Sequence, residues 1–101
     1  MQIDLLYVPD CPNRDAARNL LARALAFTDR VATVREREVH SGEEADRLGM
    51  RGSPTILIDG GDPFTPEAGP TGMACRLYRT DAGLRGVPPL PQLVEALTRS
   101  R

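Results

Sequence analysis

The stretch from Tyr7 to Arg14 constrains the fold of this chain most, because a strand pattern ends in it and a helix pattern begins. Residues 1–8 place apolar side chains on both faces, which is typical of a central strand covered by helices on both sides. Pro9 ends this strand. From Asn13 to about Phe27 the apolar residues recur at helical spacing, at Ala17, Leu20, Leu21, Ala24 and Leu25. The sequence therefore predicts a strand that leads directly into a helix.

Cys11 lies in the short connection between this strand and this helix. We expect Asp10 or Cys11 to cap the helix, and Pro12 suits its first position, where no N–H is needed. The free N–H groups and the dipole of a helix N-terminus favour an anion, and the thiolate is the reactive form of cysteine. Arg14 would add a positive charge within one turn. The pattern predicts a reactive thiol at Cys11; the alternative is an inert cysteine that packs as a small apolar residue.

The second informative stretch covers residues 52–60, Gly-Ser-Pro-Thr-Ile-Leu-Ile-Asp-Gly. Pro54 opens an apolar, β-branched strand from Thr55 to Ile58, at a position where proline is tolerated. We expect the fold to bring Pro54 close to Cys11.

The segment between these two stretches predicts a second strand and a short helix. Residues 31–39 have strand character, and their charged outer half suits an edge strand. Ser41 begins a capping-box pattern, and Gly49 follows the helix that it opens. A strand, helix and strand of this length predict a right-handed crossover and a parallel pair.

The C-terminal part begins with a long loop of high Gly and Pro content, at residues 60–73. Its apolar residues Phe64 and Met73 favour a contact with a partner or a second copy, although a passive surface loop fits equally. A fourth strand is expected from Ala74 to Arg79, then a turn-rich linker, then a helix that starts near Leu90. The predicted fold class is α/β, with a four-stranded mixed sheet in the order 2-1-3-4 and helices on both faces.

Composition places the 101 residues in one domain with an ordinary globular balance of 41% apolar and 27% charged residues. The net charge of −1 predicts no attraction to nucleic acid or to anionic membranes. No segment resembles a membrane span or a signal peptide, so we expect a cytoplasmic protein. Metal-site cysteine spacing is absent, and we expect neither a metal nor a cofactor.

The element order and the two motifs, Leu-Leu-Tyr-Val-Pro-Asp-Cys-Pro at residues 5–12 and Gly-Ser-Pro-Thr at residues 52–55, resemble the thioredoxin-like superfamily over nearly the whole chain. More narrowly, the chain is similar to short bacterial single-cysteine members, some of which carry a label tied to organomercurial cleavage. The resemblance implies that Cys11 takes the place of the first active-site cysteine and that the Ser53–Pro54 bond beside it is cis. It also implies that Pro54 and the backbone of Thr55 present an extended thiol substrate to Cys11, with Pro12, Asn13, Arg14 and Ser53 in supporting positions.

The chain departs from the Cys-x-x-Cys motif of that family because Arg14 stands where the second cysteine is expected. What remains is monothiol chemistry, namely a mixed disulfide with a low-molecular-weight thiol or a protein thiol, or oxidation of the sulfur. Two other hypotheses about the function stay open. One is a non-catalytic binding or assembly module, with a homodimer as one form of it, and the other is a protein that handles soft metals or organomercurials.

Cys75 is the possible second thiol. A fourth strand antiparallel to the third would place Cys75 ~13 Å from the level of Pro54, at ~3.3 Å per residue. A disulfide requires Cα atoms closer than about 7 Å. We therefore expect Cys75 to be a buried residue of the sheet and not the partner of Cys11.

Overall fold

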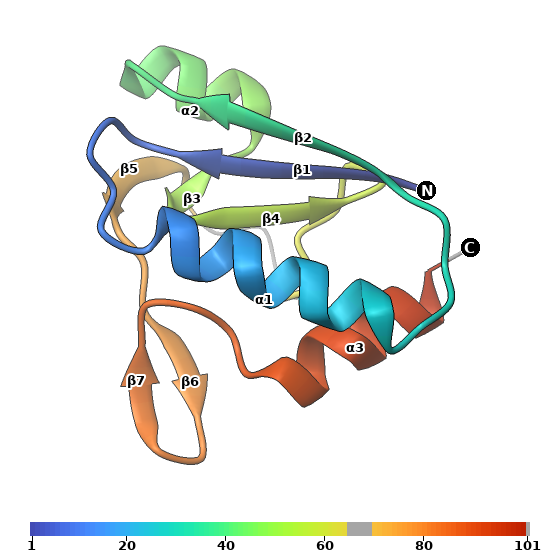
Figure 1. Ribbon diagram of the computed structural model, residues 1–101. Coiled ribbons are helices and arrows are strands. Elements are labelled where there is room, and N and C mark those ends of the chain that lie inside the picture. The colour runs from blue at the N-terminus through green and yellow to red at the C-terminus, as the bar shows by residue number, and fades with distance from the viewer. Residues whose placement is uncertain (65–69, 101) are drawn as a thin grey trace.

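The computed structural model describes residues 1–64 and 70–100 (Figure 1). Three helices and seven short strands make up this part of the chain. In order they are β1 (Gln2–Tyr7), α1 (Arg14–Ala26), β2 (Thr33–Glu38), α2 (Gly42–Leu48), β3 (Arg51–Ser53), β4 (Thr55–Ile58), β5 (Gly72–Cys75), β6 (Tyr78–Thr80), β7 (Gly83–Arg85) and α3 (Leu90–Arg99).

The main sheet has the strand order β2-β1-β4. β1 pairs in parallel with β2, from Gln2 opposite Thr33 to Tyr7 opposite Glu38. It pairs antiparallel with β4, and Leu6 lies opposite Thr55. The predicted central position of the first strand, the parallel sense of the first pair and the order of the first three strands are confirmed.

Helices cover both faces of this sheet, as its two-sided apolar pattern predicted. Figure 1 shows α1 and α3 on one side of the sheet and α2 on the other. Ile3 and Leu5 face α1 and α3 in the larger core cluster. Leu6, on the opposite face, packs with Val39 and Met50. Alternate residues of one strand thus contribute to two cores.

The predicted helix signals of α2 are confirmed at both ends. Ser41 is the N-cap, and its Oγ accepts a hydrogen bond of 3.0 Å from the backbone N–H of Glu44. The side chain of Glu44 accepts in turn from the N–H of His40, at 2.8 Å. Gly49 ends the helix in the left-handed conformation, with a φ of +80°, which glycine adopts without a steric penalty.

The predicted fourth strand is not found in the form expected. β5 pairs in parallel with β3 instead of antiparallel with the third strand of the sheet, and β6 forms a separate hairpin with β7. In the described residues the main sheet therefore has three strands, and the four-strand order 2-1-3-4 is not confirmed. The long connection after β4 explains the difference. An antiparallel neighbour is normally joined by a loop of two to about five residues, whereas this connection is long enough for the chain to return and enter beside β3. The central residues of this connection, 65–69, lie outside the described part. They are also the centre of the loop at residues 60–73, for which a contact with a partner was predicted.

None of the helices in residues 1–64 and 70–100 combines the length and the apolar character that a bilayer crossing requires.

Candidate functional site

Cys11 lies in the connection between β1 and α1, outside the helix. α1 begins at Arg14 with Asn13 in the N-cap position, and no side chain caps it. The expectation that Asp10 or Cys11 caps the helix and that Pro12 opens it is therefore wrong. Asp10 turns the backbone with a φ of +60°, and the N–H of Cys11 then donates to the carbonyl of Val8, at 3.2 Å. This extra turn delays the start of the helix.

The Cys11 side chain is half-buried, whereas Pro12 is exposed to solvent. The carbonyl of Cys11 accepts a bond of 3.3 Å from the N–H of Arg14, which closes a turn immediately before α1. Asn13 is half-buried against Gly86, where an added Cβ would lie 2.3 Å from the Asn13 side-chain nitrogen. The connection that carries Cys11 is thus held by its own turns and by the segment that follows β7.

The Ser53–Pro54 peptide bond is cis, as the resemblance implied. Ser53 is 2% exposed, and its Oγ accepts a hydrogen bond of 3.0 Å from the backbone N–H of Val8. Val8 belongs to the same connection as Cys11. Two stretches 45 residues apart in sequence are therefore joined directly at this end of the sheet.

Thr55 lies in the interior, where its side chain bonds to the backbone of β3. It is fully buried and lies opposite Leu6 in the sheet. Its hydroxyl accepts from the N–H of Arg51 at 3.1 Å and donates to the carbonyl of Gly52 at 2.5 Å. The Thr55 side chain thus braces the turn that contains Pro54, and the substrate contact of its backbone stays a prediction.

A buried polar network that the sequence did not predict lies behind this turn. The hydroxyl of Tyr78 donates to the carbonyl of Pro54 at 2.5 Å, and the N–H of Arg76 donates to the carbonyl of Ser53 at 3.0 Å. The side chains of Arg76 and Asp62 form an ion pair of 2.5 Å and are only 9% and 1% exposed. The guanidinium of Arg76 also lies 4.5 Å from the centre of the Tyr78 ring. Burial raises the pKa of Tyr78 well above its ordinary value, so the phenol remains protonated and able to donate.

Alternation in the predicted fourth strand did place Arg76 and Tyr78 on one face. The sequence did not predict their burial, because the ion-pair partner of Arg76 is Asp62, which lies 14 residues earlier in the chain within a turn cluster.

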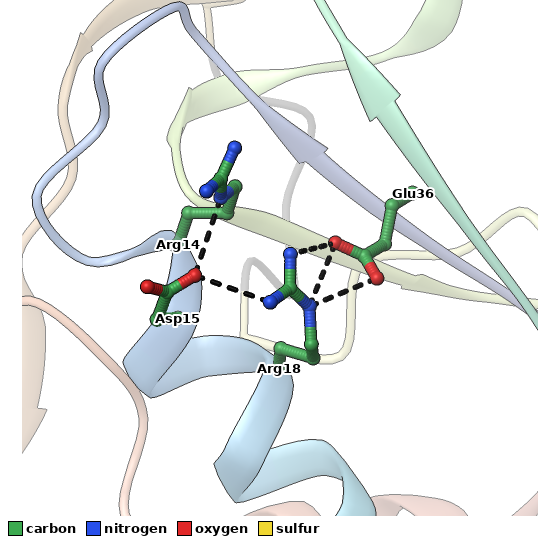
Figure 2. Close-up of polar contacts among 4 residues, drawn as sticks. All are labelled: Arg14, Asp15, Arg18 and Glu36. Atoms are coloured by element: carbon green, nitrogen blue, oxygen red, sulfur yellow. Dashed lines mark hydrogen bonds and ion pairs between the residues drawn. The ribbon is translucent and has the colours of Figure 1, made fainter.

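Arg14 contacts the strand and its own helix. Its guanidinium lies 5.4 Å from the centre of the Tyr7 ring, and its Nε lies 3.4 Å from Asp15. Figure 2 shows the ion pairs that continue from Asp15 to Arg18 and from Arg18 to Glu36 of β2, where the shortest distance is 2.7 Å. These partly exposed pairs connect the first turns of α1 to β2, the edge strand of the sheet.

Cys75 is exposed and lies at the end of β5, opposite Ser53. Both expectations about Cys75, burial in the sheet and a place at the far end of the strands, are wrong. The physical reason is the sense of pairing: β5 runs parallel to β3, so its last residue reaches the level of Ser53. Cys11 and Cys75 are both free thiols. No group of three or more His, Cys, Asp or Glu residues with metal-binding geometry occurs within the described ranges.

Comparison with protein-family models, with curated proteins and with solved structures gives no match for this chain.

Proposed function

We propose that the chain has a thioredoxin-like fold and works as a monothiol thiol–disulfide oxidoreductase through Cys11. Three observations support the fold: a parallel pair next to an antiparallel one, in the order β2-β1-β4, helices on both faces, and a cis proline immediately before β4. The sequence motifs around Cys11 and Pro54 support the same assignment.

The hydrogen bond from Val8 N–H to Ser53 Oγ carries the functional part of the proposal. It fixes the cis Ser53–Pro54 bond against the connection that holds a half-buried thiol. Reactive cysteines are typically partly exposed, and a reactive group acts best when neighbouring hydrogen bonds hold its surroundings in place.

The reaction is an exchange of one sulfur–sulfur bond for another. The Cys11 thiolate attacks one sulfur of a disulfide, a new bond forms to Cys11 Sγ, and the second sulfur leaves with the electron pair of the broken bond as a thiolate. The product is a mixed disulfide between the chain and a low-molecular-weight thiol or a protein thiol. The same steps in reverse release the free chain.

The experiment compares the two thiols one at a time. The variant Cys75→Ser retains Cys11, and Cys11→Ser retains Cys75; each is incubated with excess oxidised glutathione, and the adduct is followed by intact-mass spectrometry. We expect Cys11 to react at least about tenfold faster than Cys75, equivalent to a barrier lower by about 1.4 kcal/mol. Because Cys75 is the more exposed thiol, accessibility alone predicts the opposite order.

The same rates in urea provide the control, since unfolding removes the local environment and should bring the two rates together. Equal rates in the folded chain, or faster reaction at Cys75, would contradict the proposal and favour a non-catalytic binding module.

A further inference from the structure

We propose that Cys75 is the resolving cysteine for Cys11, so that the two thiols form one redox couple across the β1–α1 connection and β5. The inference rests on the proposed function and extends it, because it gives the mixed disulfide on Cys11 an intramolecular route of release.

The first step is the position of Cys75 along its strand. β3 and β5 change register between Arg51 and Ser53, and after this shift Cys75 pairs with Ser53. The next residue, Arg76, donates its N–H to the Ser53 carbonyl at 3.0 Å. Neighbouring strands are about 4.8 Å apart. The Cys75 backbone therefore lies next to the residue that precedes the cis bond, at the same end of the molecule as the β1–α1 connection in Figure 1.

The second step concerns the face on which the thiol lies. Paired residues of neighbouring strands carry their side chains on the same face. The Ser53 side chain points toward the β1–α1 connection, since its Oγ bonds to Val8 N–H at 3.0 Å. The side chain of Cys75 thus lies on the face of β5 that is turned toward Val8.

The third step connects Val8 to Cys11. The carbonyl of Val8 accepts the N–H of Cys11 at 3.2 Å, so this turn folds Cys11 back onto Val8. One strand pairing and two hydrogen bonds thus link Cys75 to Cys11 through Ser53 and Val8. The separation of ~13 Å expected for an antiparallel fourth strand does not apply to this arrangement. Both residues also reach solvent, since Cys75 is exposed and Cys11 is half-buried.

The chemistry balances with a low-molecular-weight disulfide as the oxidant. The Cys11 thiolate first takes one half of that disulfide and releases the other half as a thiolate. The Cys75 thiolate then attacks Cys11 Sγ, the Cys11–Cys75 bond forms, and the second small thiol leaves. Two electrons pass from the two cysteine thiols to the small disulfide, and the two protons lost by the cysteines end on the two small thiols.

The test uses the full chain and oxidised glutathione. In the wild type we expect the main product to be lighter than the reduced chain by two hydrogen atoms. Cleavage after arginine without reduction should give one species in which the peptide of residues 1–14 is linked to that of residues 52–76. In Cys75→Ser the reaction should stop at the glutathione adduct of Cys11, because no second thiol attacks it.

A matched control moves the thiol by one residue. The double variant Ala74→Cys, Cys75→Ala keeps two cysteines but transfers the second to the opposite face of β5, and both positions are exposed. We expect the linked peptides to fall at least about tenfold, a difference of about 1.4 kcal/mol, and the glutathione adduct to accumulate instead.

The outcomes separate the two proposals. A wild-type chain that stops at the Cys11 adduct, or a double variant that links as well as the wild type, overturns the assignment of Cys75 and leaves the monothiol function standing. Absence of a Cys11 adduct in Cys75→Ser overturns the monothiol function itself.

Discussion

Tyr78 shows how a single side chain supports the candidate site. Its ring packs edge-on against Phe64, with centroids 5.5 Å apart, and its hydroxyl reaches the carbonyl of Pro54. The hydroxyl therefore satisfies a carbonyl in a turn that is otherwise closed to water. A buried carbonyl that loses its donor typically costs about 1–3 kcal/mol.

The variant Tyr78→Phe should change the pH dependence of stability. Burial raises the pKa of Tyr78 in the folded chain, whereas in the unfolded chain the phenol ionises near its usual value of about 10. The stabilisation by the protonated phenol is thus complete below pH ~10 and is lost above it, by about 1.4 kcal/mol per pH unit. All 13 basic residues are arginine, so no lysine titrates in this range.

We expect urea unfolding at pH 8 to show the wild type more stable than Tyr78→Phe by about 1 kcal/mol. At pH 11.5 the order should reverse. The phenol of the unfolded wild type is ionised at this pH, whereas the folded chain still holds it protonated, and this difference lowers the stability of the wild type by ~1.4 kcal/mol per pH unit. A difference between the two proteins that stays constant with pH would contradict the burial of the phenol.

At the scale of elements, the close approach of β3 and β5 depends on Gly52. Its φ is +96°, and a Cβ there would lie 2.9 Å from the Cβ of Arg76 and 3.1 Å from the carbonyl of Ala74. Only glycine meets both demands, because it has no side chain and adopts positive φ without penalty. The pairing that places Cys75 opposite Ser53 therefore depends on glycine at position 52.

Two glycine substitutions should have opposite effects on stability. Gly52→Ala should destabilise the chain by at least about 1–2 kcal/mol, through strain and contact with Arg76. Gly42→Ala is the matched control: Gly42 opens α2 with nothing within 4 Å of an added Cβ, and alanine should stabilise by about 0.4–1 kcal/mol. The free energy of unfolding from urea titrations measures both. A neutral Gly52→Ala would show that β3 and β5 do not approach closely.

At the scale of the whole molecule, the described residues divide into a sheet covered on both faces and a peripheral hairpin. β1 pairs on both edges and is buried from Ile3 to Leu6. Among the described residues β6 pairs with β7 alone; Tyr78 anchors β6 in the interior, whereas every residue of β7 is exposed. Strands with buried contacts on both sides open only with global unfolding, whereas an exposed edge strand such as β7 opens locally.

Amide hydrogen exchange should reflect this division. We expect protection factors in β1 to exceed those in β7 by at least about 100-fold, or about 2.7 kcal/mol in opening free energy. Residue-resolved exchange by NMR at neutral pH measures the difference. Equal protection in β7 would mean that this strand unfolds only together with the sheet.

Local patterns in the sequence determined most elements and the start of the sheet. The two-sided apolar run predicted β1 as the central strand, the helical spacing predicted α1, and the signals at Ser41 and Gly49 predicted both ends of α2. Each of these features depends on residues a few positions apart, which is why the sequence sufficed. The family resemblance supplied the cis Ser53–Pro54 bond.

Only the tertiary structure decided the route of the chain after β4, and with it the surroundings of both cysteines. A long Gly- and Pro-rich connection has no local preference that fixes which strand it returns to. The parallel pairing of β5 with β3 and the buried Arg76–Asp62 pair form between segments that meet only when the chain is folded. For the same reason the sequence placed Cys75 in the interior and at the far end, whereas the fold exposes it opposite Ser53.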